Sequence, residues 1–169
     1  VKSHYTDEDY FMKPMNCPQH TQIFANKMRS YRDLPIRISD CANLYRDEKP
    51  GELAGLTRLR CFSQDDGHSF CREDQIADEF KNVLMVVKEA LDTYGLDHSI
   101  RLSLRDPNNK EKYLGDDSVW DKAESKLRSL LEESGIDFQA DEGEAAFYGP
   151  KMDIVAHDCL GRVWQISTI

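Results

Sequence analysis

Residues 44–71 alternate side chains that suit ligand binding with side chains that suit packing. A β-strand sends every second side chain to the same face. If the segment after the Pro-Gly loop is a strand, the opposite face carries Leu59, Cys61 and Ser63, which are ordinary packing residues. The binding face then carries two cations, an aromatic ring, an amide, a carboxylate and an imidazole: Arg58, Arg60, Phe62, Gln64, Asp66 and His68. The pattern predicts two strands joined by a loop, with a ligand site on one face.

Arg46 and Glu48 share a face just upstream, and with Arg58 and Phe62 they favour a nucleotide. A guanidinium binds phosphate through two parallel hydrogen bonds, a ring stacks on a base, and a carboxylate accepts from an adenine amino group. A salt-bridged sheet face with Phe62 at its rim is the alternative. The chain has neither G-x-x-x-x-G-K-[ST] nor G-x-G-x-x-G, so these residues indicate neither a P-loop nor a Rossmann site.

Cys17 and His68 are candidate zinc ligands, because thiolate and imidazole both bind zinc. Cys17 precedes Pro18 at an expected helix start, where the helix N-terminus favours a thiolate. Two such residues, far apart in sequence, equally suit a buried cysteine and a hydrogen-bonded histidine. We expect a structural role for His20, and no Ser/His/Asp or Cys/His nucleophile arrangement stands out.

Residues 143–151 are rich in small side chains and lead into an expected strand. Glycine and alanine let a ligand approach the backbone closely, and Tyr148 and Lys151 are candidates to point into one cleft. An ordinary Tyr-Gly-Pro turn is the alternative.

The composition is that of a globular domain with an acidic balance. The chain has 169 residues, 40% of them hydrophobic and 31% charged, and its net charge is −9. A self-sufficient nucleic-acid binder is usually basic, so an RNA substrate would make most of its contacts elsewhere. Five cysteines without a CxxC pair indicate a reducing compartment. No apolar run approaches the ~20 residues that span a bilayer, and no targeting segment is recognisable.

Hydrophobic periodicity predicts the secondary structure. Most of the expected strands follow loops rather than helices, which indicates an α+β domain with an antiparallel sheet and helices on one side. Both ends look cut, so we expect a piece of a larger protein. Helices are expected at 18–31, with an apolar stripe of Ile23, Phe24 and Met28, at 73–94, ended by Gly95, and at 119–133, ended by Gly135. Strands are expected at 10–15, 36–46, 100–105, 137–141, 152–156 and 162–169.

Four motifs together resemble the threonyl-tRNA synthetase family. They are MKPMNCP at 12–18, YRDE at 45–48, GLTRLRCFSQDDGH at 55–68 and AFYGPK at 146–151. The Arg-x-Glu, loop, Arg-x-x-x-Phe pattern at about 44–68 is similar to motif 2 of class II synthetases. The resemblance runs from about residue 10 to the last residue. It implies a class II antiparallel sheet flanked by helices, with residues 1–169 forming a partial catalytic domain, incomplete at both ends.

The resemblance implies a zinc ion that binds the amino and hydroxyl groups of threonine. Cys17 and His68 would be two of its three protein ligands, and the third would lie outside this chain. Zinc with open positions suits such chelation, which valine, lacking the hydroxyl, cannot satisfy. Asp66 would take the threonine amino or hydroxyl group, and the rest of the amino-acid pocket would be lined by Gln64, Tyr148 and Met15.

For ATP, the resemblance implies that Arg46 holds the α-phosphate, Glu48 contacts the adenine amino group and Phe62 stacks on adenine. Arg58 would reach the terminal phosphate. Mg²⁺ would accompany ATP, and charge neutralisation would provide much of the catalysis. Two further residues would lie close to the nucleotide: Lys151 near the α-phosphate, and Gln165.

The chain departs from the family pattern at two places beside the proposed ligands. Gln19 replaces the usual Gly after Met-Asn-Cys-Pro, and Gly67 replaces the usual Ala before the histidine. By the same resemblance, motif 1, motif 3 and the anticodon-binding domain lie outside this chain, so we expect the fragment alone to be inactive.

The resemblance predicts a threonine–tRNA ligase that acts on ATP, L-threonine and tRNA(Thr). We expect a cytoplasmic protein, a homodimer in its full-length form, with no membrane association. Two alternatives stay open: a synthetase-like paralogue that binds nucleotide or amino acid without aminoacylation, and a plain α+β interaction domain.

Overall fold

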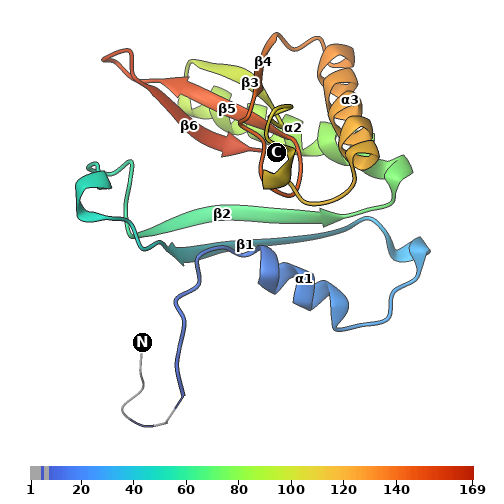
Figure 1. Cartoon of the computed structure of the whole chain (residues 1–169), viewed down its shortest axis with the longest axis horizontal. Coiled ribbons are helices and arrows are strands. Elements are labelled where there is room, and N and C mark those ends of the chain that lie inside the picture. Colours follow the sequence, from blue (N-terminus) through green and yellow to red (C-terminus); the bar gives the residue numbers. More distant parts are fainter. Residues whose placement is uncertain (1–4, 6–7) are drawn as a thin grey trace. The chain divides into compact units, whose positions relative to one another are not determined.

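The computed structural model describes residue 5 and residues 8–169, and the chain divides into two compact units (Figure 1). Unit 1 is Val1–Glu79 and unit 2 is Phe80–Ile169. No helix in the described part of the chain combines the length and apolar character that crossing a membrane requires.

Unit 1 is built on an antiparallel hairpin of β1 (Ile36–Tyr45) and β2 (Cys61–Phe70). Ile38 pairs with His68 and Leu44 with Phe62, so the strands are in register along their whole length. The connecting loop contains the short 3₁₀ helix η2 (Pro50–Glu52). The prediction of two strands joined by a Pro-Gly loop is therefore confirmed.

The helix α1 (Cys17–Ala25) is shorter than the sequence predicted. Proline is tolerated in the first turn of a helix, where its missing N–H is not needed. The helix packs through Phe24, whose ring stacks on Phe70 of β2 at 4.2 Å between centroids. Ile23 and Met28 are exposed, so the predicted apolar stripe to residue 31 is wrong; the chain instead forms the 3₁₀ helix η1 (Tyr31–Asp33).

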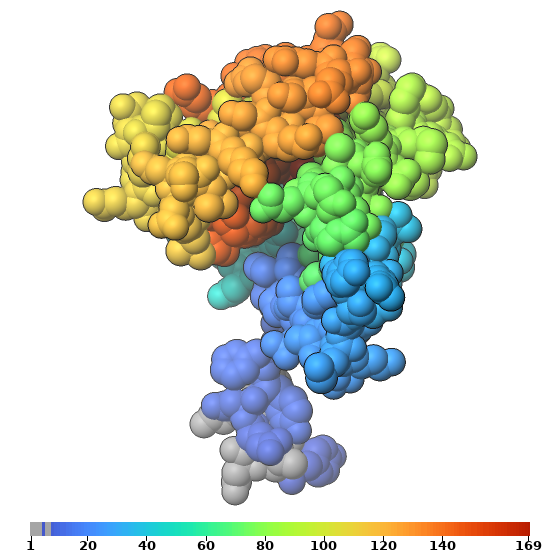
Figure 2. Space-filling model, turned by 90° about the vertical axis from the view of Figure 1, so that its right-hand side faces the viewer, coloured from blue at the N-terminus to red at the C-terminus, as the bar shows by residue number. Residues whose placement is uncertain are grey.

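The segment before α1 is not the strand that was expected at residues 10–15. Among the hydrogen bonds of the described residues, one backbone bond joins this segment to the hairpin. In it the Tyr45 N–H donates to the Lys13 carbonyl at 2.8 Å. Phe11 is 92% exposed. Figure 2 shows this segment, in dark blue, extending away from α1 within unit 1.

After β2 the chain forms η3 (Glu73–Gln75) and then α2 (Ile76–Tyr94), which begins in unit 1 and continues into unit 2. The first turn of α2 is tied to β1 by a two-pronged ion pair: Arg37 donates to the buried Glu79 carboxylate at 2.5 and 2.7 Å. Gly95 ends the helix with a positive φ of 63°, which glycine adopts without strain. The predicted helix and its stop are confirmed.

Unit 2 contains a four-stranded sheet in the order β4-β3-β5-β6. Its strands are β3 (His98–Leu104), β4 (Phe138–Glu142), β5 (Lys151–His157) and β6 (Val163–Thr168). β5 pairs antiparallel with β3 and β6, whereas β3 and β4 run parallel. A parallel pair requires a crossover, and α3 (Asp117–Glu133) provides it. The α+β class is confirmed, with a mixed sheet in place of a wholly antiparallel one.

The sheet of unit 2 has an apolar face and a polar face. In the pairing of β3 with β5, Leu102 lies opposite Met152 and Ile100 opposite Ile154, and three of these four side chains are fully buried. Burying a side chain of this size contributes roughly 1.5–3 kcal/mol. The helices add to the buried apolar set through Phe80, Leu91, Trp120, Leu130 and Leu131.

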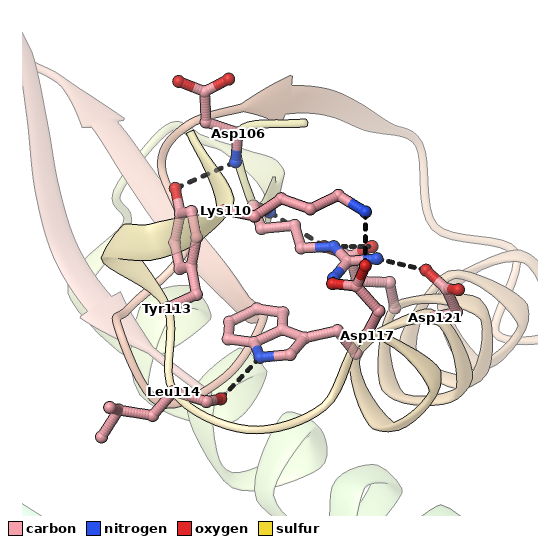
Figure 3. Close-up of polar contacts among 9 residues, drawn as sticks. Asp106, Lys110, Tyr113, Leu114, Asp117 and Asp121 are labelled. Atoms are coloured by element: carbon pink, nitrogen blue, oxygen red, sulfur yellow. Dashed lines mark hydrogen bonds and ion pairs between the residues drawn. The ribbon is translucent and has the colours of Figure 1, made fainter. Parts of the chain in front are cut away.

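The start of α3 is anchored to the end of β3 by Arg105. Its guanidinium is largely buried and bonds to Asp117 at 2.7 Å and to Asp121, while its backbone N–H donates to Glu124 at 2.9 Å. Figure 3 shows Asp117 and Asp121 converging from the first turns of the helix, with Lys110 of η4 (Lys110–Lys112) also on Asp117. Arg105 therefore fixes the crossover helix to the sheet.

Arg105→Ala should loosen the beginning of α3. The substitution removes charged hydrogen bonds from a largely buried group, which costs roughly 1–3 kcal/mol. Amide hydrogen exchange on the complete protein should show residues 117–124 exchanging roughly tenfold faster or more. Lys88→Ala is the matched control, because the Lys88–Asp92 pair is exposed and contributes roughly 0.3–0.5 kcal/mol. Equal exchange rates in the two variants would contradict this role of Arg105.

The turn between β5 and β6 is held by the Asp158 carboxylate. It accepts from the Trp164 indole at 3.0 Å, from the backbone N–H of Arg162 and of Leu160 at 2.9 Å each, and from the Arg162 guanidinium at 2.6 Å. These donors, with Trp164 the largest influence, hold the pKa of Asp158 well below the ordinary aspartate value of 3.8.

Asp158 should therefore make stability depend on pH in the acid range. A carboxyl whose pKa is lower in the folded state stabilises it fully above the ordinary pKa, and this stabilisation is lost as pH falls through the folded-state pKa. Unfolding midpoints of the wild type and Asp158→Asn should differ most near pH 6 and converge as pH falls below about 4. A difference that stays constant from pH 6 to pH 3 would contradict this origin.

Candidate nucleotide and amino-acid site

The predicted binding face lies on one side of the hairpin in unit 1. The register of β1 and β2 sets Phe62 opposite Leu44, and it aligns the three polar positions as Gln64 with Ala42, Asp66 with Asp40, and His68 with Ile38. Paired residues of an antiparallel ladder project to the same side. Phe62, Gln64, Asp66 and His68 therefore share one face, as the sequence predicted.

The opposite face of β2 is not a packing face. Cys61 and Ser63 are exposed, although the sequence indicated ordinary packing residues there. The half-buried positions Phe62, Asp66 and His68 are those of the polar face. The reason lies in α1, which covers the end of the polar face through Phe24 and His20.

Arg58 and Glu48 are paired with each other across the loop between the strands. The Arg58 Nε lies 3.0 Å from a Glu48 carboxylate oxygen, and its Nη2 lies 3.8 Å from Glu52. The Arg60 Nε donates to the Glu48 backbone carbonyl at 3.0 Å. These bonds give the loop a defined shape and hold the adenine and terminal-phosphate candidates side by side.

Arg46 and Phe62 form a second pair. The Arg46 guanidinium lies over the Phe62 ring at 5.1 Å from its centroid, within the range of a cation–π interaction. The Arg46 N–H also donates to the Arg60 carbonyl at 2.9 Å, which extends the ladder one residue beyond β1. A guanidinium and a ring stacked on each other present a cation beside a flat apolar surface, the two features that a nucleotide requires.

His68 bonds to a histidine that the sequence gave only a structural role. The Nδ1 atoms of His20 and His68 lie 2.7 Å apart, and His20 is 2% exposed. One of these nitrogens donates and the other accepts, so the contact restricts the ring orientation of His68. Asp66 lies farther away, with a carboxylate oxygen 4.0 Å from the His68 Nδ1. The spacing Cys17-x-x-His20 could have indicated that His20 lies on the same helix face as Cys17, because residues i and i+3 of a helix are neighbours on its surface.

Cys17 fits a metal site in its chemistry and its surroundings. It lies one helical turn before His20 and is half-buried. Asn16, beside it, is fully buried, and neither its side-chain oxygen nor its nitrogen has a partner. Within the described residues, no group of three or more His, Cys, Asp and Glu side chains is arranged to hold a metal ion. Thiolate and imidazole suit zinc in their chemistry, and with Cys17 and His68 as ligands the set would need another donor.

The two departures from the family pattern leave the backbone regular. Gln19 is exposed on α1. At Gly67 an added Cβ would meet the Ile38 carbonyl oxygen at 3.7 Å and the Ser39 Cβ at 3.8 Å, which is ordinary contact. Alanine would fit there, so glycine at this position does not alter the hairpin. Met15, the remaining candidate in unit 1, is exposed just before α1.

Unit 2 carries the other three candidates. Lys151 and Gln165 belong to one hydrogen-bond network on the polar face of the sheet, centred on Asp153. Tyr148 lies in the turn closed by the Ala146–Gly149 bridge and is 70% exposed. Asp153 was not among the predicted residues. One carboxylate inside the apolar run Met152–Ala156 was a signal, because a charge in a buried strand needs partners.

Comparison with known proteins assigns the family. The model for the "tRNA synthetase class II core domain (G, H, P, S and T)" matches residues 1–169. A threonine–tRNA ligase from Rubrobacter xylanophilus is 53% identical over 161 residues, which are 95% of this chain and 25% of that protein. One from Rhodopirellula baltica is 49% identical, over 96% of this chain and 22% of that protein. This chain thus spans about a quarter of the length of the curated relatives it matches.

A solved structure agrees with these matches. It is described as the RNA binding domain of threonyl-tRNA synthetase from Cryptosporidium parvum, with a TM-score of 0.85 and 41% identity over 92% of this chain and 38% of that chain. The fold is that of a class II aminoacyl-tRNA synthetase core. Within that class, the chain belongs to the threonyl-tRNA synthetase family.

Proposed function

We propose that the complete protein containing this chain is a threonine–tRNA ligase. It activates threonine with ATP, releasing pyrophosphate, and passes threonine from the adenylate to tRNA(Thr). The observation that carries the proposal is the hairpin of unit 1, which gathers an arginine–ring pair, an arginine–glutamate pair and the Gln64, Asp66 and His68 side chains on and beside one strand.

The nucleotide part of the proposal rests on the two pairs. Adenine stacks on Phe62 and donates its amino group to Glu48. Arg58, whose Nε lies 3.0 Å from Glu48, turns to the terminal phosphate. Its side chain is half exposed and so is free to change rotamer. Arg46 holds the α-phosphate together with the threonine carboxylate. Guanidinium groups suit this role because they keep their charge and offer paired donors.

The threonine part rests on the end of the polar face next to α1. Asp66 binds the amino or hydroxyl group, and Gln64 and Met15 line the pocket. Tyr148, in unit 2, is assigned to threonine by the family resemblance alone. Cys17 and His68 would hold the zinc ion, with a third ligand outside this chain. Zinc, when bound, supplies open coordination positions for the amino and hydroxyl groups of threonine. The contact with His20 keeps the His68 ring in a fixed orientation.

The chemistry requires no protein nucleophile. The threonine carboxylate attacks the α-phosphorus of ATP and pyrophosphate leaves. Arg46 neutralises charge that develops on the α-phosphoryl oxygens. Lys151 and Gln165, in unit 2, are assigned to the α-phosphate and the nucleotide by the family resemblance alone. Positioning and preorganised charge can account for most of the rate enhancement in phosphoryl and acyl activation. Mg²⁺ would neutralise the outgoing pyrophosphate.

The partners of the complete protein follow from the same proposal. They are ATP, L-threonine and tRNA(Thr), with a second copy of the protein in a homodimer, in the cytoplasm. The acidic balance of this chain, −9 over 169 residues, supports RNA contacts made mostly by other parts of the protein.

Amino-acid-dependent exchange of pyrophosphate into ATP tests the activity. The complete protein should exchange strongly with threonine, more weakly with serine, and not with valine. Valine lacks the hydroxyl group, and a site built to bind that group rejects the analogue strongly. A folded, zinc-loaded protein that exchanges with none of the three would support instead a paralogue that binds without activating.

Removing either proposed ligand should remove zinc and activity together. Cys17→Ala and His68→Ala in the complete protein should each lower the zinc content after dialysis to well below one ion per chain. Threonine-dependent exchange should fall in parallel, because threonine loses its binding partner. Metal content is read by elemental analysis and folding by circular dichroism.

Cys159→Ala and His157→Ala are the matched controls, since both residues are exposed in unit 2. Both controls should keep zinc and exchange activity. Normal threonine activation by a zinc-free Cys17 or His68 variant would refute the metal role and leave the ATP site untouched.

A further inference from the structure

The polar face of the unit 2 sheet is organised around one buried carboxylate. Arg101 of β3, Asp153 of β5 and Thr168 of β6 are directly paired across the three strands, so their side chains project to the same side. Lys151 lies two residues before Asp153 on β5 and therefore shares that side. Asp153 is 0% exposed, the most enclosed acidic side chain of the described residues.

Four side chains donate to Asp153. The Lys151 ammonium contacts Oδ2, the Ser103 hydroxyl donates to the same oxygen at 2.7 Å, and Arg101 Nη2 lies 3.3 Å from it. The Thr168 hydroxyl donates to Oδ1 at 2.7 Å. Burial alone would raise the pKa of Asp153, but the bonds from Lys151, Ser103 and Thr168 outweigh it and keep the pKa below the ordinary value. The carboxylate is therefore ionised at neutral pH.

The same network fixes the amide of Gln165. Its oxygen accepts from Arg101 Nη2 at 3.4 Å, and its nitrogen donates to the Thr168 hydroxyl oxygen at 2.7 Å. Arg101 and Thr168 both bond to Asp153. Because Arg101 donates to the amide oxygen and Thr168 accepts from the amide nitrogen, the orientation of the Gln165 amide is fixed. Lys151 and Gln165, which come from different strands, are thus oriented by one carboxylate.

Arg101 and Lys151 offer donors that Asp153 does not engage. Their two positive charges are balanced by Asp153 and by Asp141 of β4, which pairs with Ser103 and so lies on the same face. The ammonium of Lys151 has three donors, of which Asp153 engages one. Arg101 Nε is buried and has no hydrogen-bond partner. The face therefore keeps unengaged donors, which an anion such as a phosphate group would require.

We propose that Asp153 is a positioning residue for the nucleotide: its carboxylate holds Lys151 directly, and Gln165 through Arg101 and Thr168, in the directions in which they meet the phosphate and the nucleoside of ATP. This inference rests on the proposed function, because it gives a nucleotide role to Lys151 and Gln165. A purely structural ion pair would stabilise the sheet and leave catalysis unchanged, so the two roles differ in what a substitution changes.

Asp153→Asn in the complete protein tests the proposal. The kcat/KM for ATP in threonine-dependent exchange should fall about 10- to 100-fold, because a small misplacement of reacting groups costs that much. Asp158→Asn is the matched control: it is a carboxylate on the same hairpin, held by four hydrogen bonds, at the opposite end from Asp153. It should lower the unfolding midpoint and leave kcat/KM for ATP within about twofold.

A pair of variants at Thr168 tests the network without removing a charge. Thr168→Val keeps the side-chain shape and removes the hydroxyl, so kcat/KM for ATP should fall about 3- to 10-fold. Thr168→Ser keeps the hydroxyl and should stay within about twofold of the wild type. Rescue by serine is a result that loss of stability alone does not produce, because both variants are close in size to threonine.

The outcomes separate this inference from the proposed function. If the wild type exchanges with threonine and Asp153→Asn matches it, the positioning role is overturned and the ligase activity stands. If the wild type exchanges with no amino acid, ATP binding by calorimetry decides. Affinity lowered tenfold or more in Asp153→Asn, but unchanged in Asp158→Asn, supports the positioning role; equal affinities overturn it.

Discussion

The alternation of side chains along paired β-strands determines where the chemistry of this chain lies. In unit 1 it sets Phe62, Gln64, Asp66 and His68 on one face of the β1–β2 hairpin. In unit 2 it divides the sheet into an apolar face and a polar face with Asp153 at its centre. A one-residue slip of register would reverse both faces. The cross-strand pairing of Ile38 with His68 therefore matters as much to the site as the histidine itself.

Polar side chains on these faces are held by neighbouring side chains of the same unit. Glu48 holds Arg58, Phe62 supports Arg46, His20 contacts His68, and Asp153 gathers Lys151. Each contact limits the rotamers of a long or mobile side chain, which lowers the entropy that ligand binding must remove. On the unit 2 face the same contacts hold two cations, Arg101 and Lys151, against the Asp153 carboxylate. Preorganised charge of this kind is how a site without a nucleophile can accelerate a reaction.

Much of this could be predicted from the sequence, and the limits have physical causes. The period-2 pattern from Arg58 to His68 was sufficient to predict the binding face, and Gly95 and Gly135 correctly marked two helix ends. The stripe Ile23, Phe24, Met28 misled, because only Phe24 finds a partner, the Phe70 ring. The parallel pairing of β3 with β4 depends on the path of α3, which local periodicity does not contain. The His20–His68 contact and the Arg101–Asp153 pair join residues 48 and 52 positions apart, so the sequence can single out the residues but only tertiary structure reveals these contacts.

A crystal structure of the complete protein with zinc and a non-hydrolysable analogue of threonyl-adenylate tests the central claim most directly. The adenine ring should lie on Phe62, Arg46 against the phosphate and zinc on Cys17 and His68, and Lys151 should still bond to Asp153 while it reaches the ligand. An analogue bound away from the polar face of the β1–β2 hairpin, in contact with neither Phe62 nor Arg46, would contradict the proposal.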